Sequence, residues 1–85
     1  MESEPITLSI RVMDGDNFIV TCHLEDTVEM LKQKVESVTC IPVSSQRLIF
    51  QGRVLRNDQT LQDCRISNNC AIFLIRQSVL PLYKR

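Results

Sequence analysis

The chain has 85 residues and a mass of 9.8 kDa, which allows one small domain and leaves no room for a second hydrophobic core. Ten Lys and Arg balance ten Asp and Glu, and 44% of the residues are hydrophobic, a composition typical of a globular domain rather than of a disordered chain. No apolar run approaches the roughly 20 residues of a membrane span, and two glycines with one histidine provide neither a phosphate-binding loop nor much acid–base chemistry. We therefore do not expect an enzyme.

Charge is unevenly distributed along the chain. Residues 1–29 carry seven acidic side chains against Arg11, whereas residues 30–85 carry nine basic side chains against three acidic ones. Folding can mix the two halves into an ordinary surface, or it can gather a basic face from Arg47, Arg53, Arg56, Arg65 and Arg76. Nucleic acid is not the expected partner of such a face, because no aromatic side chains alternate with these arginines.

Four cysteines and one histidine are the candidates for metal or redox chemistry. Cys22, Cys40, Cys64 and Cys70 contain no Cys-x-x-Cys spacing of the kind that zinc sites and thioredoxin-like pairs use. The first residues do not form a secretory signal, so we expect reduced thiols, with Cys22 and Cys64 as small core side chains. A metal, redox or nucleophilic site that joins His23 to a cysteine stays an alternative that no spacing supports. We predict no metal and no cofactor.

The chain opens with a pattern typical of a β-hairpin. Apolar and polar side chains alternate over residues 6–12, and they alternate again from Phe18 to Leu24. Between the two runs lies Asp14-Gly15-Asp16-Asn17, a cluster of turn-forming residues. The pattern predicts two antiparallel strands joined by a turn.

The period then changes to that of a helix. Asp26 or Thr27 can serve as the N-cap, and Glu29 stands three positions after Asp26, as in a capping box. One apolar face is formed by Val28, Leu31, Val35 and Val38. Lys32 is expected on a more exposed side. Pro42 disfavours helical geometry at the residue before it, so the helix should end before that point.

Further strands and an irregular segment complete the predicted fold. Strands are expected at residues 47–51, 53–55 and 71–76. Leu61 and Ile66 should anchor the irregular segment between the last two strands. Together with the hairpin and the helix, these elements give one α+β domain in which the sheet and the helix bury each other's apolar faces. The expected organisation is a lead at 1–5, the domain at 6–76 and a linker stub or frayed tail at 77–85.

The third and the last strands depart from the rule that one face of an antiparallel strand is polar. If their even-numbered residues face the core, apolar side chains also face outward at Ile49, Phe73 and Ile75. Were the two strands neighbours, these side chains would form one apolar patch that Met13 could extend. A basic rim would come from Arg47, Arg53 and Arg76. Exposed contiguous apolar surface marks a partner site, unless another layer, a dimer or the tail covers it.

An ordered set of motifs in this chain resembles ubiquitin. The motifs are Asp26-Thr27-Val28, Ile41-Pro42, Gln46-Arg47-Leu48-Ile49-Phe50-Gln51-Gly52-Arg53 and Thr60-Leu61-Gln62-Asp63. The resemblance runs without a gap from Ile6 to about Arg76. It implies the ubiquitin-like β-grasp fold, a mixed sheet of four or five strands packed on one α-helix, with the third and last strands adjacent.

The resemblance also implies where partners bind. The apolar recognition patch of the ubiquitin family is matched at Met13, Ile49 and Ile75, and its border at Arg47 and Gly52. Phe73 stands where ubiquitin has a histidine, so the patch would be more apolar and would differ in partner preference. The predicted partner-binding site is therefore Met13, Arg47, Ile49, Gly52, Arg53, Phe73 and Ile75.

Two departures from ubiquitin decide the expected function. Ubiquitin and its conjugated relatives end, once processed, in Gly-Gly, whereas the only glycines here are Gly15 and Gly52. Of the lysines that ubiquitin uses for chain building, Lys32 and Lys34 are matched, and the principal linkage positions fall on Arg53 and Asn68. We therefore expect a non-conjugated domain that shares the recognition surface of ubiquitin without its chemistry.

Such domains commonly sit at the N-terminus of larger proteins of protein quality control. These include proteasome shuttle factors of the ubiquilin type and the large BAG-family chaperone cofactor. The resemblance implies a cytoplasmic or nuclear module, monomeric in isolation, that binds ubiquitin-interacting helices or proteasomal receptors and neither nucleic acid nor membranes. The alternative is a regulatory domain of a ubiquitin ligase, deubiquitinase or other enzyme, in which the same patch contacts a sibling domain.

Overall fold

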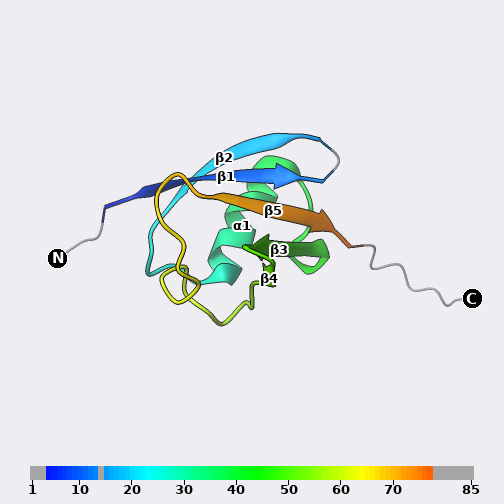
Figure 1. Ribbon diagram of the computed structural model, residues 1–85. Coiled ribbons are helices and arrows are strands. Elements are labelled where there is room, and N and C mark those ends of the chain that lie inside the picture. The colour runs from blue at the N-terminus through cyan, green and yellow to red at the C-terminus, as the bar shows by residue number, and fades with distance from the viewer. Residues whose placement is uncertain (1–3, 14, 78–85) are drawn as a thin grey trace, which may run out of the picture.

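Five strands and one long helix follow the order in which the sequence patterns occur (Figure 1). The computed structural model describes residues 4–13 and 15–77, so most of the expected lead and tail, and Asp14 of the first turn, lie outside the described residues. The elements are β1 (Ile6–Val12), β2 (Asn17–Cys22), α1 (Val28–Thr39), a short 3-10 helix (Val43–Ser45), β3 (Gln46–Phe50), β4 (Arg53–Val54) and β5 (Ala71–Arg76). Their sheet order is β2-β1-β5-β3-β4.

The first two strands form the predicted antiparallel hairpin. Ile6 pairs with Cys22 and Arg11 with Asn17, and the turn closes through a hydrogen bond from Val12 N to Asp16 O at 2.8 Å. β2 stops at Cys22, two residues before the expected end, because the next backbone N–H, that of His23, donates to the Asp26 carboxylate at 3.0 Å.

Helix α1 begins where the sequence placed it, and Thr27 is the N-cap. Its Oγ1 accepts from Met30 N at 3.2 Å, while the carboxylate of Asp26, the other candidate, accepts from His23 N. The helix ends before Pro42, as expected, with Cys40 in the left-handed conformation. Two expectations for its faces were wrong: Lys32 is buried, and Val38 is 47% exposed. Val38 lies in the last turn of the helix and is not part of the core cluster.

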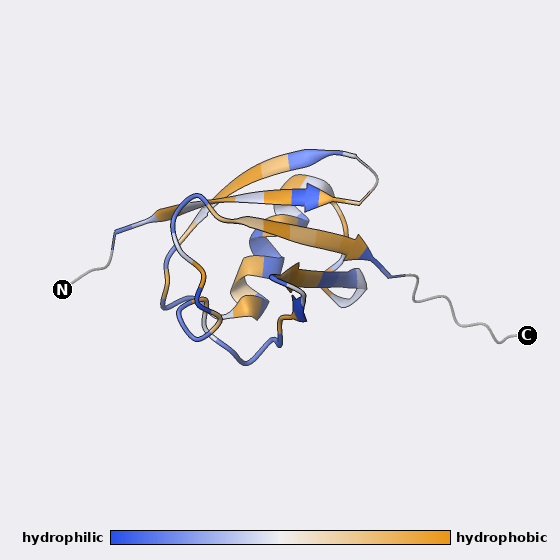
Figure 2. Cartoon of the chain, in the orientation of Figure 1, coloured by the Kyte–Doolittle hydropathy of each residue, from blue (hydrophilic) through white to orange (hydrophobic). Residues whose placement is uncertain are grey.

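The expected adjacency of the third and last strands is confirmed. β5 lies between β1, to which it is parallel, and β3, to which it is antiparallel, so the sheet is mixed. Figure 2 shows apolar residues along most of β5. The predicted anchors of the irregular segment, Leu61 and Ile66, are both buried in the core.

The core fills the space between the sheet and α1. Alternate residues of the central strands have no solvent exposure, namely Leu8, Ile10, Leu48, Ile72 and Leu74, and they meet Val28, Leu31 and Val35 of the helix. Because side chains alternate along a strand, the residues between them point to the other face of the sheet, away from α1. The outer face of β1, β3, β4 and β5 is therefore not covered by α1 and is available for contacts with other molecules.

Candidate functional site

The centre of the outer face is a pair of apolar side chains on β3 and β5. Ile49 and Phe73 are directly opposite each other in the β3–β5 ladder, and Arg47 is opposite Ile75. Their neighbours along the chain, Leu48 and Leu74, are fully buried on the helix side. Phe73 is 46% exposed, and Ile49 and Ile75 are half-buried. The structure therefore brings together the apolar residues that the strand pattern assigned to one patch.

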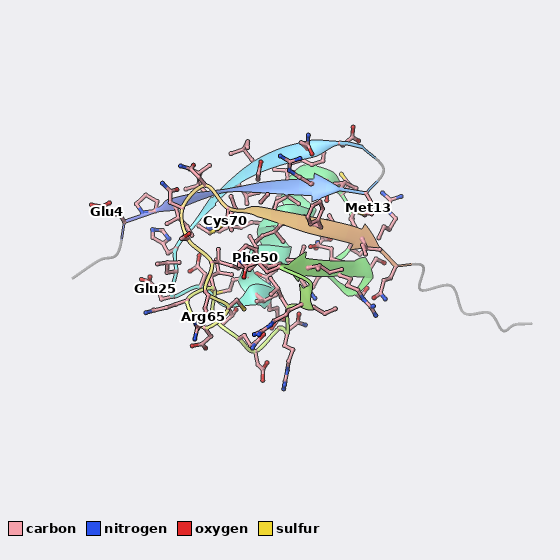
Figure 3. The ribbon with its side chains drawn as sticks, viewed as in Figure 1. Glu4, Met13, Glu25, Phe50, Arg65 and Cys70 are labelled. Carbon is pink, nitrogen blue, oxygen red and sulfur yellow. The ribbon has the colours of Figure 1, made fainter. Side chains whose placement is uncertain are left out.

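Met13 adds to this group from the end of β1. Its N–H donates to Leu74 O at 3.0 Å, which fixes the chain beside β5, and its side chain is 63% exposed. Figure 3 places Met13 where β1 ends, next to the final part of β5. An exposed thioether adapts to the shape of whatever it contacts.

Sequence reasoning missed two members of the outer face, Val54 and Arg11. Val54 is opposite Ile49 in the β3–β4 pair and is 51% exposed, and Arg11 is opposite Phe73 in the parallel β1–β5 pair. Both depend on register between strands, which the alternation within one strand does not specify. The apolar docking face is hereafter Met13, Ile49, Val54, Phe73 and Ile75.

Two arginines lie on the outer face beside the docking face: Arg11 is opposite Phe73, and Arg47 is opposite Ile75. The other predicted rim residues, Arg53 and Arg76, are also exposed, but they stand opposite the buried Phe50 and Gln46, so the register places them on the α1 side of the sheet. The Gln77 side-chain amide, oriented to satisfy both groups, accepts from Arg47 Nη2 at 2.7 Å and from Nε at 3.1 Å. Gln77 is itself tied to the fold, because its N–H donates to Ser45 O at 2.7 Å. Arg47 on β3 is thus held in place by Gln77, the residue that follows β5.

Gly52 lies in the turn that joins β3 to β4. It has a φ of 79° and Gln51 a φ of 55°, and positive φ at both central residues is what a tight two-residue hairpin turn requires. A Cβ at Gly52 would meet nothing within 4 Å. The glycine therefore serves the backbone of the turn, and it borders the docking face without adding side-chain contact.

The cysteines and His23 do not form a reactive centre in the described part of the chain. The four cysteines are free, and no group of three or more metal-binding side chains occurs among the described residues. Burial raises the pKa of the Cys22 thiol to about 11, so this group is protonated at neutral pH. His23 Nδ1 lies 3.9 Å from Asp26 Oδ2, and Lys34 Nζ lies 3.7 Å from the same oxygen, an arrangement that ties β2 to the start of α1. No helix in residues 4–13 and 15–77 is long and apolar enough to cross a membrane.

Comparisons with known proteins agree with the fold and with the sequence resemblance. The family model described as "Ubiquitin family" matches residues 8–78. The ubiquitin domain-containing protein DSK2b of Arabidopsis thaliana is 36% identical over 77 residues, which cover 91% of this chain and 14% of that protein. The E3 ubiquitin-protein ligase UPL5 of the same plant is 36% identical over 76 residues, which cover 87% of this chain and 9% of the ligase. This chain therefore spans only a small part of either relative.

A solved structure gives the same answer for the fold. The crystal structure of the UBL domain of Plasmodium falciparum Dsk2 superposes with a TM-score of 0.84 at 30% sequence identity, covering 87% of this chain and all of that one. The predicted β-grasp fold, a mixed five-stranded sheet with one helix, is confirmed. From its fold, its motifs and the family model that matches most of its length, the chain belongs to the ubiquitin family.

Proposed function

We propose that this chain is a non-conjugated ubiquitin-like binding module that docks through its apolar face onto ubiquitin-interacting helices or proteasomal receptors. The observation that carries the proposal is the pair of half-buried Ile49 and exposed Phe73 at the centre of a sheet face that also carries Arg11 and Arg47. Exposed apolar surface with a polar border marks a partner site on a small domain. An amphipathic helix with acidic residues on its polar side fits such a face in both shape and charge.

The expected interaction is weak and reversible. The face offers five apolar side chains, two of them half-buried, so little area becomes buried and few anchors are available. Interfaces of this kind lie at the low end of interface sizes, with affinities around micromolar. Weak binding suits a carrier that must release its cargo or its receptor.

The proposal assigns the module to a larger protein of the shuttle type in protein quality control, in the cytoplasm or nucleus. The similarity to DSK2b and to the Dsk2 UBL domain supports this assignment, since the chain spans a small fraction of DSK2b. We propose no catalysis and no cofactor for the module itself, whose function is recognition. We further propose that it is monomeric in isolation.

Regulation within a larger enzyme is the second candidate function. It is favoured by one observation, the similarity of this chain to part of the ubiquitin ligase UPL5. In that case the docking face contacts a sibling domain of the same protein. A helix added in trans would then compete with the sibling domain in the full-length protein, whereas the isolated module would bind the helix freely.

An NMR titration of the isolated module with a ubiquitin-interacting helix tests the main proposal. Amide shifts should concentrate at Ile49, Phe73 and Ile75 and saturate at micromolar concentrations of the helix. Val38, which is exposed on α1 at the opposite side of the sheet, serves as the internal control and should not shift. Shifts confined to α1, or no shifts at all, would refute docking through this face.

A further inference from the structure

A groove lies beside β4, at the edge of the docking face. It has a volume of about 520 Å³ and lies between the β3–β4 hairpin and the 59–65 segment. Its walls include Val54 of the docking face and three arginines, Arg53, Arg56 and Arg65. Neither the family match nor the proposed helix docking gives this groove a role.

Local hydrogen bonds hold the groove in shape. The Gln59 side-chain oxygen accepts from Arg56 N at 3.1 Å and from the Cys64 thiol at 3.7 Å. Across the 60–63 turn, Asp63 N donates to Thr60 Oγ1 at 3.0 Å, and Thr60 N donates to the Asp63 carboxylate at 3.3 Å. The groove is therefore preformed, which lowers the ordering entropy that a ligand must offset.

The groove is basic. Its one acidic wall residue, Asp63, has a carboxylate oxygen engaged by the backbone N–H of Thr60. Arg56 Nε lies 3.7 Å from Asp58 Oδ1, but both side chains are 75% exposed, and an ion pair so open to water contributes little. A carboxylate from a partner can therefore replace it. Arginine is suited to this role because its planar guanidinium donates two parallel hydrogen bonds to one carboxylate.

The groove lies at the Val54 end of a row of apolar side chains on the docking face. Phe73, Ile49 and Val54 are successive partners across β5, β3 and β4, and Val54 also lines the groove. Neighbouring strands are about 4.8 Å apart, so Phe73 and Val54 are separated by about 10 Å, the length of about seven helical residues. A partner lying across this row reaches the groove directly after its last apolar contact.

We propose that the groove receives an acidic segment that flanks the partner's docking helix, with its carboxylates bound by Arg53 and Arg56. This inference rests on the proposed function, because it places the acidic segment next to a helix on the docking face. It specifies the partner further: a cluster of Asp or Glu follows the amphipathic helix at the end that lies over Val54. The groove then sets the direction in which the helix binds.

Peptide titrations of the isolated module test the inference. Three peptides share the same amphipathic helix. The first has no extension, the second has a short run of glutamates at its N-terminus, and the third has the same run at its C-terminus. At low salt, one of the two extended peptides should bind about tenfold more tightly than the unextended helix. This gain should shrink as the salt concentration rises to about 300 mM, because salt weakens ion pairs that are open to water.

The double variant Arg53→Gln/Arg56→Gln should lose this gain and bind all three peptides within about twofold of one another. The matched control Arg11→Gln/Arg76→Gln removes the same charge from exposed arginines outside the groove and should keep the preference for one extended peptide. Equal gain from both extensions, or a gain that survives in Arg53→Gln/Arg56→Gln, would overturn the inference and leave helix docking intact. Equally tight binding of a single-stranded DNA oligonucleotide through Arg53 and Arg56 would also overturn it.

The two proposals fail separately in this design. The unextended helix tests docking alone, and the ratio of extended to unextended affinity tests the groove alone. If the unextended helix does not bind while one extended peptide binds through Arg53 and Arg56, the groove binds the acidic segment, but docking on the apolar face and the orienting role of the groove are both refuted. If no peptide binds, both proposals are refuted.

Discussion

Ile49 and Phe73 lie directly opposite each other on β3 and β5, with both side chains on the sheet face away from α1. Directly opposed side chains have Cβ atoms about 4.5–5.5 Å apart, so they present one continuous apolar surface to a partner. Neither side chain is needed to fill the core, because Leu48 and Leu74 occupy that side of the same strands with no exposure. Changes at this pair therefore separate binding from folding.

Replacing Ile49 by alanine should weaken helix binding by about 1–3 kcal/mol, since a central anchor of a small interface carries much of its energy. The measurement is isothermal titration of the isolated module with a ubiquitin-interacting helix. Ile19→Ala is the matched control, because Ile19 is 62% exposed on the edge strand β2 and outside the docking face. Equal losses in the two variants would mean that Ile49 is not a specific anchor.

Alternation along single strands was enough to predict which side chains of β3 and β5 face outward. If Leu48 and Leu74 face the core, the two-residue period of a strand predicts that Ile49, Phe73 and Ile75 face outward. The adjacency of these strands did not follow from the pattern, because it depends on pairing between segments far apart in the chain. The resemblance to ubiquitin supplied it.

What the sequence missed also depended on long-range geometry. β4 is two residues long, so no period could show that Val54 stands opposite Ile49. Arg11 lies opposite Phe73 because β1 and β5 pair in parallel. The burial of Lys32 was missed because a charged side chain favours solvent exposure. In the structure, its backbone oxygen accepts a hydrogen bond from the buried Gln46 side chain at 2.8 Å.

Cys40→Gly should stabilise the fold by about 0.5–1 kcal/mol. Cys40 caps α1 with a φ of 65°, a conformation that glycine adopts freely but that is strained for a residue with a Cβ. Its side chain is exposed, so little packing is lost. Urea unfolding measures the change, and Cys40→Ala is the control that removes the thiol but keeps the Cβ. If the alanine variant gains as much as the glycine variant, the backbone explanation is wrong.

The Cys22 thiol should make the fold less stable as the solution becomes alkaline. Burial raises its pKa from 9.0 to about 11, with smaller opposing effects of Lys34, which lowers it, and Asp26, which raises it. The unfolded chain loses this proton near pH 9 and the folded chain near pH 11. The folded state thus holds the proton more tightly, and its contribution is complete below pH 9 and falls as the pH rises towards 11, by at most about 1.4 kcal/mol per pH unit.

The measurement is the free energy of unfolding as a function of pH in the native chain and in Cys22→Ala. The variant should start less stable because it loses a buried sulfur, but its slope between about pH 9 and 11 should be shallower. Thiol labelling at neutral pH gives an independent check, with Cys40 reacting quickly and Cys22 only on unfolding. Identical slopes in the two proteins would show that Cys22 does not titrate in the way its burial requires.

Gln77→Ala should weaken helix binding by a few-fold while leaving the fold nearly as stable as before. The Gln77 amide oxygen holds Arg47 through two hydrogen bonds, of 2.7 and 3.1 Å, so the arginine side chain is already ordered before a partner arrives. Without this restraint, binding must order the side chain itself, at about 0.5–1.5 kcal/mol. The backbone bond from Gln77 N to Ser45 O does not depend on the side chain and should persist.

A double-mutant cycle identifies this effect as positioning of Arg47. If Gln77 acts only through Arg47, Gln77→Ala should have no further effect on helix affinity once Arg47 has been replaced by alanine. Additive losses would mean that Gln77 contacts the partner directly. An unchanged affinity in Gln77→Ala alone would mean that Arg47 either is ordered by other contacts or does not take part in docking, and the single variant Arg47→Ala separates these two cases.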